Sequence, residues 1–168
     1  TINLGKKITN TLRYGPMLHQ LQAAPNELSE DQYVQKIILD ELAANQEDIA
    51  VPGFVFGFKV QNADAAKTQL QRLEAYLRVM LENVPELMPI REGFRRVQLA
   101  GSDFLTLSLK GELLPWHEIP FAELAETPGQ YDALRKKISE LTVVLSLGLR
   151  DGFVLLSVGP STDALANM

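Results

Sequence analysis

The sequence predicts an α+β fold, a mainly antiparallel sheet of about five strands with helices on one face and a helical N-terminal segment. Residues 54–60 carry phenylalanine at alternate positions, a pattern typical of a strand with one apolar face. Residues 142–149 and 153–158 also read as strands, and they flank residues 150–152, Arg-Asp-Gly. Asp-Gly favours a hairpin because both turn positions of a type I′ turn need positive φ.

Two further strands and two helical stretches complete the predicted α+β domain. They are a long helix at 62–84, strands at 94–100 and 104–110 around a turn at 101–103, and a mixed helical region at 121–140. Apolar residues recur at helical spacing through the long helix, which Asn62 caps and Pro85 ends. We expect this helix and the 121–140 region to cover one face of the sheet.

Residues 1–50 are predicted to be a helical N-terminal segment, packed on or leading into the core of the α+β domain at 51–168. Ser29 and Gln32 have the spacing of a capping box, which marks the start of a helix. Upstream, an apolar helical pattern is interrupted at Gly15-Pro16. We therefore expect two or three helices before residue 50.

Composition excludes several classes of function. The 168 residues are 46% hydrophobic and carry a net charge of −5, which gives no long-range attraction for nucleic-acid phosphates or anionic lipid. No run approaches the roughly 18–20 apolar residues of a membrane span, so we expect none in this segment. The chain has no cysteine, which excludes disulfides, thiolate nucleophiles and cysteine metal sites.

A β–α pattern occurs twice along the chain. Gly53-Phe54-Val55 recurs 99 positions later, with residue 152 corresponding to residue 53, and Asn62 corresponds to Ser161 at the same offset. The pattern predicts a duplicated strand-to-helix unit whose second helix is cut short at Met168. Shared strand-to-helix chemistry explains the recurrence, and a pair of equivalent ligand sites is the functional alternative. The ends of the sequence suggest a fragment of a larger protein.

The two histidines are the first candidates for chemistry. His19 has Ala23 at i+4, so it forms no helical metal pair. His117 adjoins Trp116 and Glu118 in a proline-bounded connection, which makes His117 and Glu118 candidate catalytic residues. The alternative is that Trp116 fills the core beneath a loop. The sequence contains no G-x-S-x-G, P-loop, G-x-G-x-x-G or EF-hand pattern, so no cofactor and no metal ligands are predicted.

A strand–helix–strand order also suits RNA-binding sheets, which expose aromatic and basic side chains together. Here the aromatic positions Phe54, Phe56 and Phe58 coincide with the expected core face, and the net charge has the wrong sign. We therefore predict no nucleic-acid partner.

Three segments carry a resemblance to a known class of proteins: residues 51–60, 101–105 and 151–157. With Ala65-Ala66, Leu70 and Leu73, they resemble an uncharacterised class of secreted or envelope-associated bacterial proteins in which β–α–β–β units recur along a long exported chain. The similarity covers about residues 50–168. It implies a non-enzymatic domain of unknown role in the periplasm or cell envelope.

The leading hypothesis is a non-catalytic interaction or scaffold domain of a larger exported protein, bound to a protein partner or to the rest of its own polypeptide. The alternative is a hydrolase-type enzyme whose site assembles from distant carboxylates around Trp116 and His117. A converging polar cleft would favour the enzyme, whereas an exposed apolar patch or an open sheet edge would favour the interaction domain.

Overall fold

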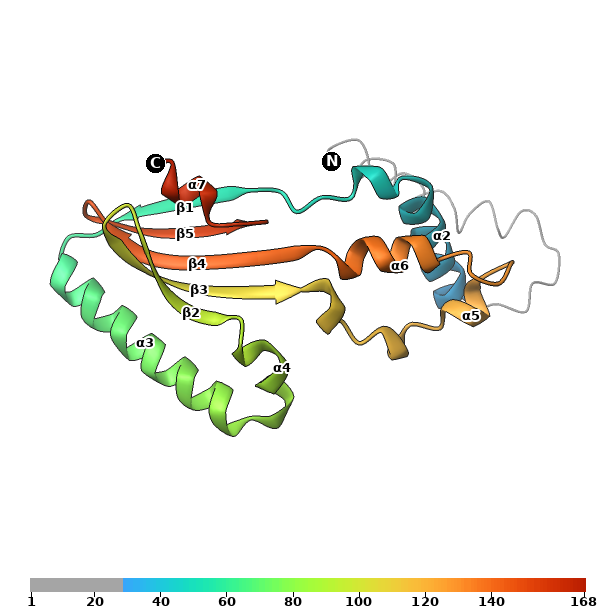
Figure 1. Ribbon diagram of the computed structural model, residues 1–168, viewed down its shortest axis with the longest axis horizontal. Helices are drawn as coiled ribbons and strands as arrows, with labels where there is room; N and C mark the ends of the chain where they lie inside the picture. Colours follow the sequence, from blue (N-terminus) through green and yellow to red (C-terminus); the bar gives the residue numbers. More distant parts are fainter. Residues whose placement is uncertain (1–28) are drawn as a thin grey trace. The chain divides into compact units, whose positions relative to one another are not determined.

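The computed structural model describes residues 29–168, which divide into two compact units (Figure 1). The described part of the first, the helical unit, comprises residues 29–50 and 114–140. The second, the sheet unit, comprises residues 51–113 and 141–168. Residues 114–140, which the sequence analysis placed with the sheet, therefore belong with the helical segment.

The helical unit is built from α2 and several shorter helices. They are α2 (Glu30–Ala44), η1 (Gln46–Asp48), η4 (Trp116–Glu118), α5 (Phe121–Leu124) and α6 (Asp132–Ser139). The predicted capping box is confirmed, because the Ser29 hydroxyl accepts from Gln32 N and the Gln32 side chain accepts from Ser29 N. Leu124, Tyr131 and Leu134 form the buried core, which explains why 121–140 packs here. The helices expected before residue 29, and His19, lie outside the described residues.

The sheet unit confirms the predicted α+β fold, with five antiparallel strands. They are β1 (Phe54–Lys59), β2 (Phe94–Leu99), β3 (Ser102–Lys110), β4 (Thr142–Arg150) and β5 (Phe153–Gly159). They lie in the order β1-β5-β4-β3-β2 (Figure 1), so β1 and β2 are the two edges. The helices of this unit are α3 (Ala63–Asn83), η2 (Pro85–Leu87), α4 (Met88–Arg91), η3 (Gly111–Leu113) and α7 (Asp163–Ala166).

Two tight turns fix the register of the hairpins. Between β4 and β5, Asp151 and Gly152 both have positive φ, 50° and 78°, as the Asp-Gly pattern predicted. Between β2 and β3 the turn is Ala100-Gly101, with φ of 47° and 79°. The predicted turn at 101–103 was therefore wrong, because a two-residue turn matches the twist of the strands and leaves residues 102 and 103 in β3.

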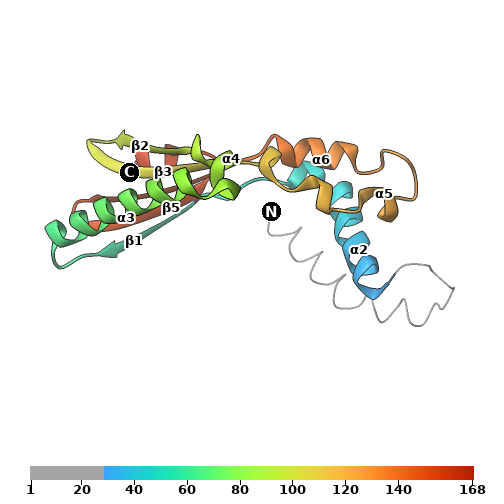
Figure 2. The ribbon, with the colours of Figure 1, turned by 90° about the horizontal axis from the view of Figure 1, so that it is seen from below.

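Side chains alternate between two faces of the sheet, which we name after the helices that lie on them. On the α7 face, Leu165 of α7 packs against Phe104 and Leu155, and all three are buried. On the α3 face, α3 lines cavities together with Leu105 and Leu147, and Figure 2 shows this helix running along the sheet. The long helix thus lies on one face as predicted, and the four-residue α7 lies on the other.

Candidate functional site

The edge strand β1 exposes a row of phenylalanines on the α3 face, which we call the phenylalanine stripe: Phe54, Phe56 and Phe58. Their exposed fractions are 51%, 50% and 60%. The expectation that these side chains lie in the core was wrong. The helix α3 links the two edge strands, but its sheet-facing side lies against β2, β3 and β4 and leaves β1 uncovered.

The apolar surface continues from the stripe onto β5 and α3. Phe56 pairs across the strands with Leu156, which is half-buried on the same face. Leu156 in turn lines a narrow apolar cavity of about 160 Å³ with Leu73 of α3. Phe54 and Phe56 stack with ring centroids 6.3 Å apart. Contiguous apolar surface of this kind marks interaction sites on folded proteins.

Among residues 29–168, no strand pairs with the outer side of β1, which is therefore an open hydrogen-bonding edge in the described part of the chain. Val60 N donates to Gly152 O at 2.9 Å, which extends the β1–β5 ladder by one position. Antiparallel strands alternate between hydrogen-bonded and non-hydrogen-bonded pairs, so residues 54, 56 and 58 direct their backbone groups to β5. The N–H and C=O groups of Val55, Gly57 and Lys59 therefore point away from the sheet, where a further strand can bind them.

A buried carboxylate, Glu74, fastens α3 to β2 beside a cavity of about 280 Å³. Its Oε1 accepts from Arg78 at 2.8 and 3.1 Å, and its Oε2 pairs with Arg96 of β2. Burial on its own raises the pKa of Glu74, but the hydrogen bonds and charges of Arg96 and Arg78 outweigh it and hold the pKa below its ordinary value. Both oxygens are engaged, so Glu74 is a structural anchor. Glu74 was not among the residues predicted from the sequence, although its i, i+4 spacing to Arg78 indicates an ion pair on one helix face.

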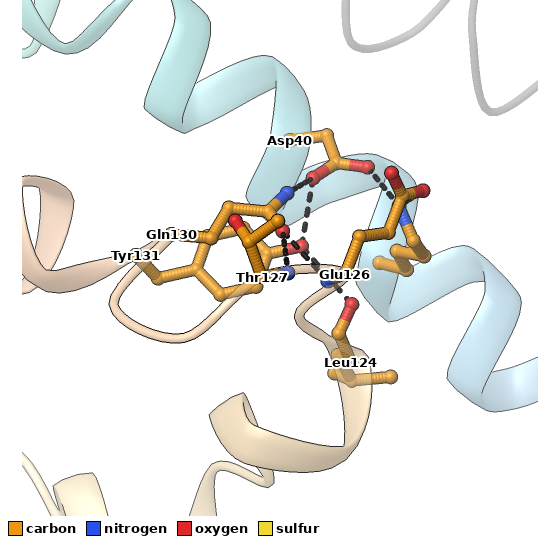
Figure 3. Close-up of polar contacts among 7 residues, drawn as sticks. Asp40, Leu124, Glu126, Thr127, Gln130 and Tyr131 are labelled. Atoms are coloured by element: carbon orange, nitrogen blue, oxygen red, sulfur yellow. Dashed lines mark hydrogen bonds and ion pairs between the residues drawn. The ribbon is translucent and has the colours of Figure 1, made fainter.

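The helical unit contains a polar cluster around Asp40 of α2 (Figure 3). Asp40 Oδ1 accepts from Tyr131 OH at 2.7 Å and from Gln130 Nε2 at 2.9 Å. Its Oδ2 lies 2.6 Å from Lys36 Nζ, which also lies 3.0 Å from Glu126. The cluster thus ties α2 to the segment between α5 and α6.

The protonation states of the side chains in this cluster suit a structural role and not proton transfer. Burial, assisted by the hydrogen bond to Asp40, raises the pKa of Tyr131 to about 12, so the phenol stays protonated and donates. Burial lowers the pKa of Lys36, but the hydrogen bonds to Asp40 and Glu126 outweigh it and raise the pKa above its ordinary value. An open cavity of about 480 Å³ adjoins Gln130 and Tyr131. We interpret the cluster as structural.

The predicted catalytic candidates lie on η4 of the helical unit. The side chains of His117 and Glu118 are 84% and 69% exposed, and their Nε2 and Oε1 atoms are 4.0 Å apart. Within residues 29–168, Glu118 is the only acid at ion-pair distance from His117. Trp116 is half-buried, with its ring centroid 6.1 Å from that of Phe121, which agrees with the packing alternative.

Beyond the stripe and the two structural clusters, residues 29–168 contain no further candidate site. Residues 29–168 contain no cluster of three histidine, aspartate or glutamate side chains placed to hold a metal ion. None of the helices in this range is long and apolar enough to cross a membrane. No family model, curated protein or solved structure matches the chain. The phenylalanine stripe is therefore the candidate functional site.

Proposed function

We propose that the sheet unit is a non-catalytic interaction domain of a larger exported bacterial protein, and that it binds another polypeptide through β1. The observation that supports this function is a row of three exposed phenylalanines on an open edge strand. Exposed aromatic surface is unfavourable in water, and covering it is the main favourable term in protein association. The context of an exported protein rests on the resemblance carried by residues 51–60 and 151–157.

Strand addition is the binding mode that suits this edge. A partner strand beside β1 would bond the outward N–H and C=O groups of Val55, Gly57 and Lys59. Alternate side chains of that strand would lie on the α3 face next to the stripe. The backbone then supplies affinity and the three phenylalanines supply a preference for apolar side chains.

Other functions gain less support from the described residues. Glu74 and Tyr131, which have perturbed pKa values, are both engaged by neighbouring side chains, and His117 is exposed. The hydrolase alternative thus lacks a converging polar site. A nucleic-acid partner was predicted to be absent because the phenylalanines were expected in the core and because the net charge is negative. The phenylalanines are exposed, so only the net charge of −5 still argues against nucleic-acid binding.

Site-specific photocrosslinking tests the proposal in the full-length parent protein. A photoreactive phenylalanine analogue replaces Phe58 in one variant and Gln98 in the other. Gln98 is a matched control because it is exposed on the same face, at the opposite edge strand. We expect a covalent product with a polypeptide identified by mass spectrometry from position 58 and none from position 98. Equal products from both positions, or none from either, would overturn the proposal.

A further inference from the structure

We propose that the polypeptide bound by β1 is β1 of a second copy of this chain, paired antiparallel about a two-fold axis at Phe56. This inference rests on the proposed function and names its partner. It predicts one continuous sheet across two copies, with both phenylalanine stripes on the same side. Three observations support it: the direction of the backbone groups, the spacing of the phenylalanines and the area of exposed apolar surface.

The backbone groups of β1 match those of a second β1 in this register. With Phe56 opposite Phe56, Val55 of each copy lies opposite Gly57 of the other. Val55 and Gly57 both direct their N–H and C=O groups outward, so each such pair exchanges two hydrogen bonds. In a register shifted by one residue, backbone N–H and C=O groups that point outward in one copy would lie opposite groups that point inward in the other, and the hydrogen bonds would not form.

The side chains of residues 54–58, Phe-Val-Phe-Gly-Phe, are self-complementary about Phe56. Phe54 of each copy lies opposite Phe58 of the other, so all six rings pair with rings. These are non-hydrogen-bonded pairs, in which opposite side chains approach most closely. On the other face, Val55 lies beside Gly57, which has no side chain to clash with it.

The exposed apolar area is sufficient for a weak dimer. The stripe and Leu73, which lines the same cavity as Leu156, expose about 400 Å² per copy, taking about 200 Å² for a whole aromatic side chain. Two copies therefore offer about 800 Å² of apolar surface, in the range of weak and transient associations. We expect a dissociation constant in the micromolar range.

The two edges of the sheet differ in their protection against strand pairing. The edge strand β2 carries Arg95 and Arg96, charges of the kind that protect natural edges. The edge strand β1 contains no proline and only one charge, Lys59, at its end. This contrast assigns the pairing to β1.

Cysteine crosslinking tests the register, because the native chain has no cysteine and an introduced thiol is unique. In the proposed dimer the Cα atoms of the two Phe56 residues are about 4.5 Å apart, within the range of a disulfide. We expect Phe56→Cys to form a disulfide dimer under mild oxidation. Phe54→Cys alone should not, because its two copies lie about 14 Å apart along the strands. A mixture of Phe54→Cys and Phe58→Cys should crosslink, and Gln98→Cys should not.

Charge pairing tests the two-fold contact in solution, by sedimentation equilibrium of the full chain. Phe56→Glu and Phe56→Lys should each weaken the dimer at least tenfold, because like charges meet at the axis, and mixing the two variants should restore it. Thermal melting checks that both variants fold. Gln98→Glu, at the opposite edge, should leave the dimer unchanged.

Failure of this inference is distinguishable from failure of the proposed function. A native chain that sediments as a monomer up to millimolar concentration, with no Phe56→Cys disulfide, overturns the second-copy proposal. If position 58 then photocrosslinks to a different polypeptide, the proposed function stands without it. If position 58 crosslinks to no polypeptide, both the proposed function and the second-copy inference are wrong.

Discussion

Phe104 and Phe56 belong to the same sheet but to opposite faces, and their surroundings differ completely. Phe104 is 0% exposed, whereas half of Phe56 is exposed. The α7 face is closed by a helix of only four residues, because Leu165 sits on Phe104 and Leu155. The 21-residue α3 leaves the stripe open on its own face. Coverage of a sheet therefore depends on the path of the helix across it and not on its length.

The largest effect is expected at the closed face. Phe104→Ala should lower the free energy of unfolding by about 3–5 kcal/mol, because it removes a fully buried ring and leaves a cavity beneath Leu165. Urea unfolding of the full chain measures this. A loss of free energy of unfolding below about 1 kcal/mol would mean that the side chains of the α7 face repack around the missing ring. Phe104 would then stabilise the fold no more than Phe56 does.

Overpacking at the same place should have a smaller effect. Gly148 lies opposite Phe104, and a Cβ atom built on it would lie 2.4 Å from the Phe104 ring and 2.7 Å from Asp103 O. Gly148→Ala should therefore cost about 1–3 kcal/mol in the same unfolding assay. Gly101→Ala would not serve as a control, because its φ of 79° strains any side chain. Gly53→Ala, with nothing near its Cβ, is the matched control.

The anchor of α3 should contribute about 1 kcal/mol at neutral pH, since Arg78 and Arg96 are both partly exposed. Glu74→Gln removes the charge and keeps the volume. The folded-state pKa of Glu74 lies below its ordinary value of 4.5, so its contribution is present above that value and is lost as the pH falls through the folded-state pKa. The free energies of unfolding of the native chain and of Glu74→Gln should therefore become equal at acid pH. If the difference in free energy of unfolding between the two chains stayed constant from neutral to acid pH, Glu74 would not stabilise the fold through its charge.

The smallest effect is expected at the open face. Phe56→Ala should change the free energy of unfolding by less than about 1 kcal/mol, because half of the side chain already contacts water. The measurement needs dilute protein, since self-association would add a concentration-dependent contribution to stability. A loss as large as that of Phe104→Ala would show that the stripe is part of the core.

Local features of the fold were predictable from the sequence because they depend on neighbouring residues. The Asp151-Gly152 turn, the Asn62 cap of α3 and the Ser29 capping box all act within a few positions. Ser161 was expected to cap a helix, and its hydroxyl does accept from Asp163 N, although Thr162 occupies the N-cap position of α7. Each of these contacts is encoded within a single short segment.

The long-range arrangement was not predictable in the same way. The alternation of phenylalanines in 54–58 identifies an apolar face but not what covers it, because that depends on where α3 crosses the sheet. The assignment of 114–140 failed for a related reason. Tyr131 reaches Asp40, 91 positions away, and no local pattern in either segment specifies that pairing. The candidate site was thus visible as a strand, but its exposure was not.

The junction between β3 and β4 has a consequence for protein engineering. Lys110 pairs with Thr142, and Gly111 N donates to Leu141 O at 2.8 Å, so the strands remain joined up to the point where residues 114–140 leave the sheet. The chain leaves the sheet after residue 113 and returns at residue 141, and these two points are about one strand spacing apart. A short turn can close a gap of this size. The site therefore has the geometry of a hairpin loop that accepts an inserted domain. Excision of 114–140, or a graft of another domain in its place, should leave the register of the sheet unchanged.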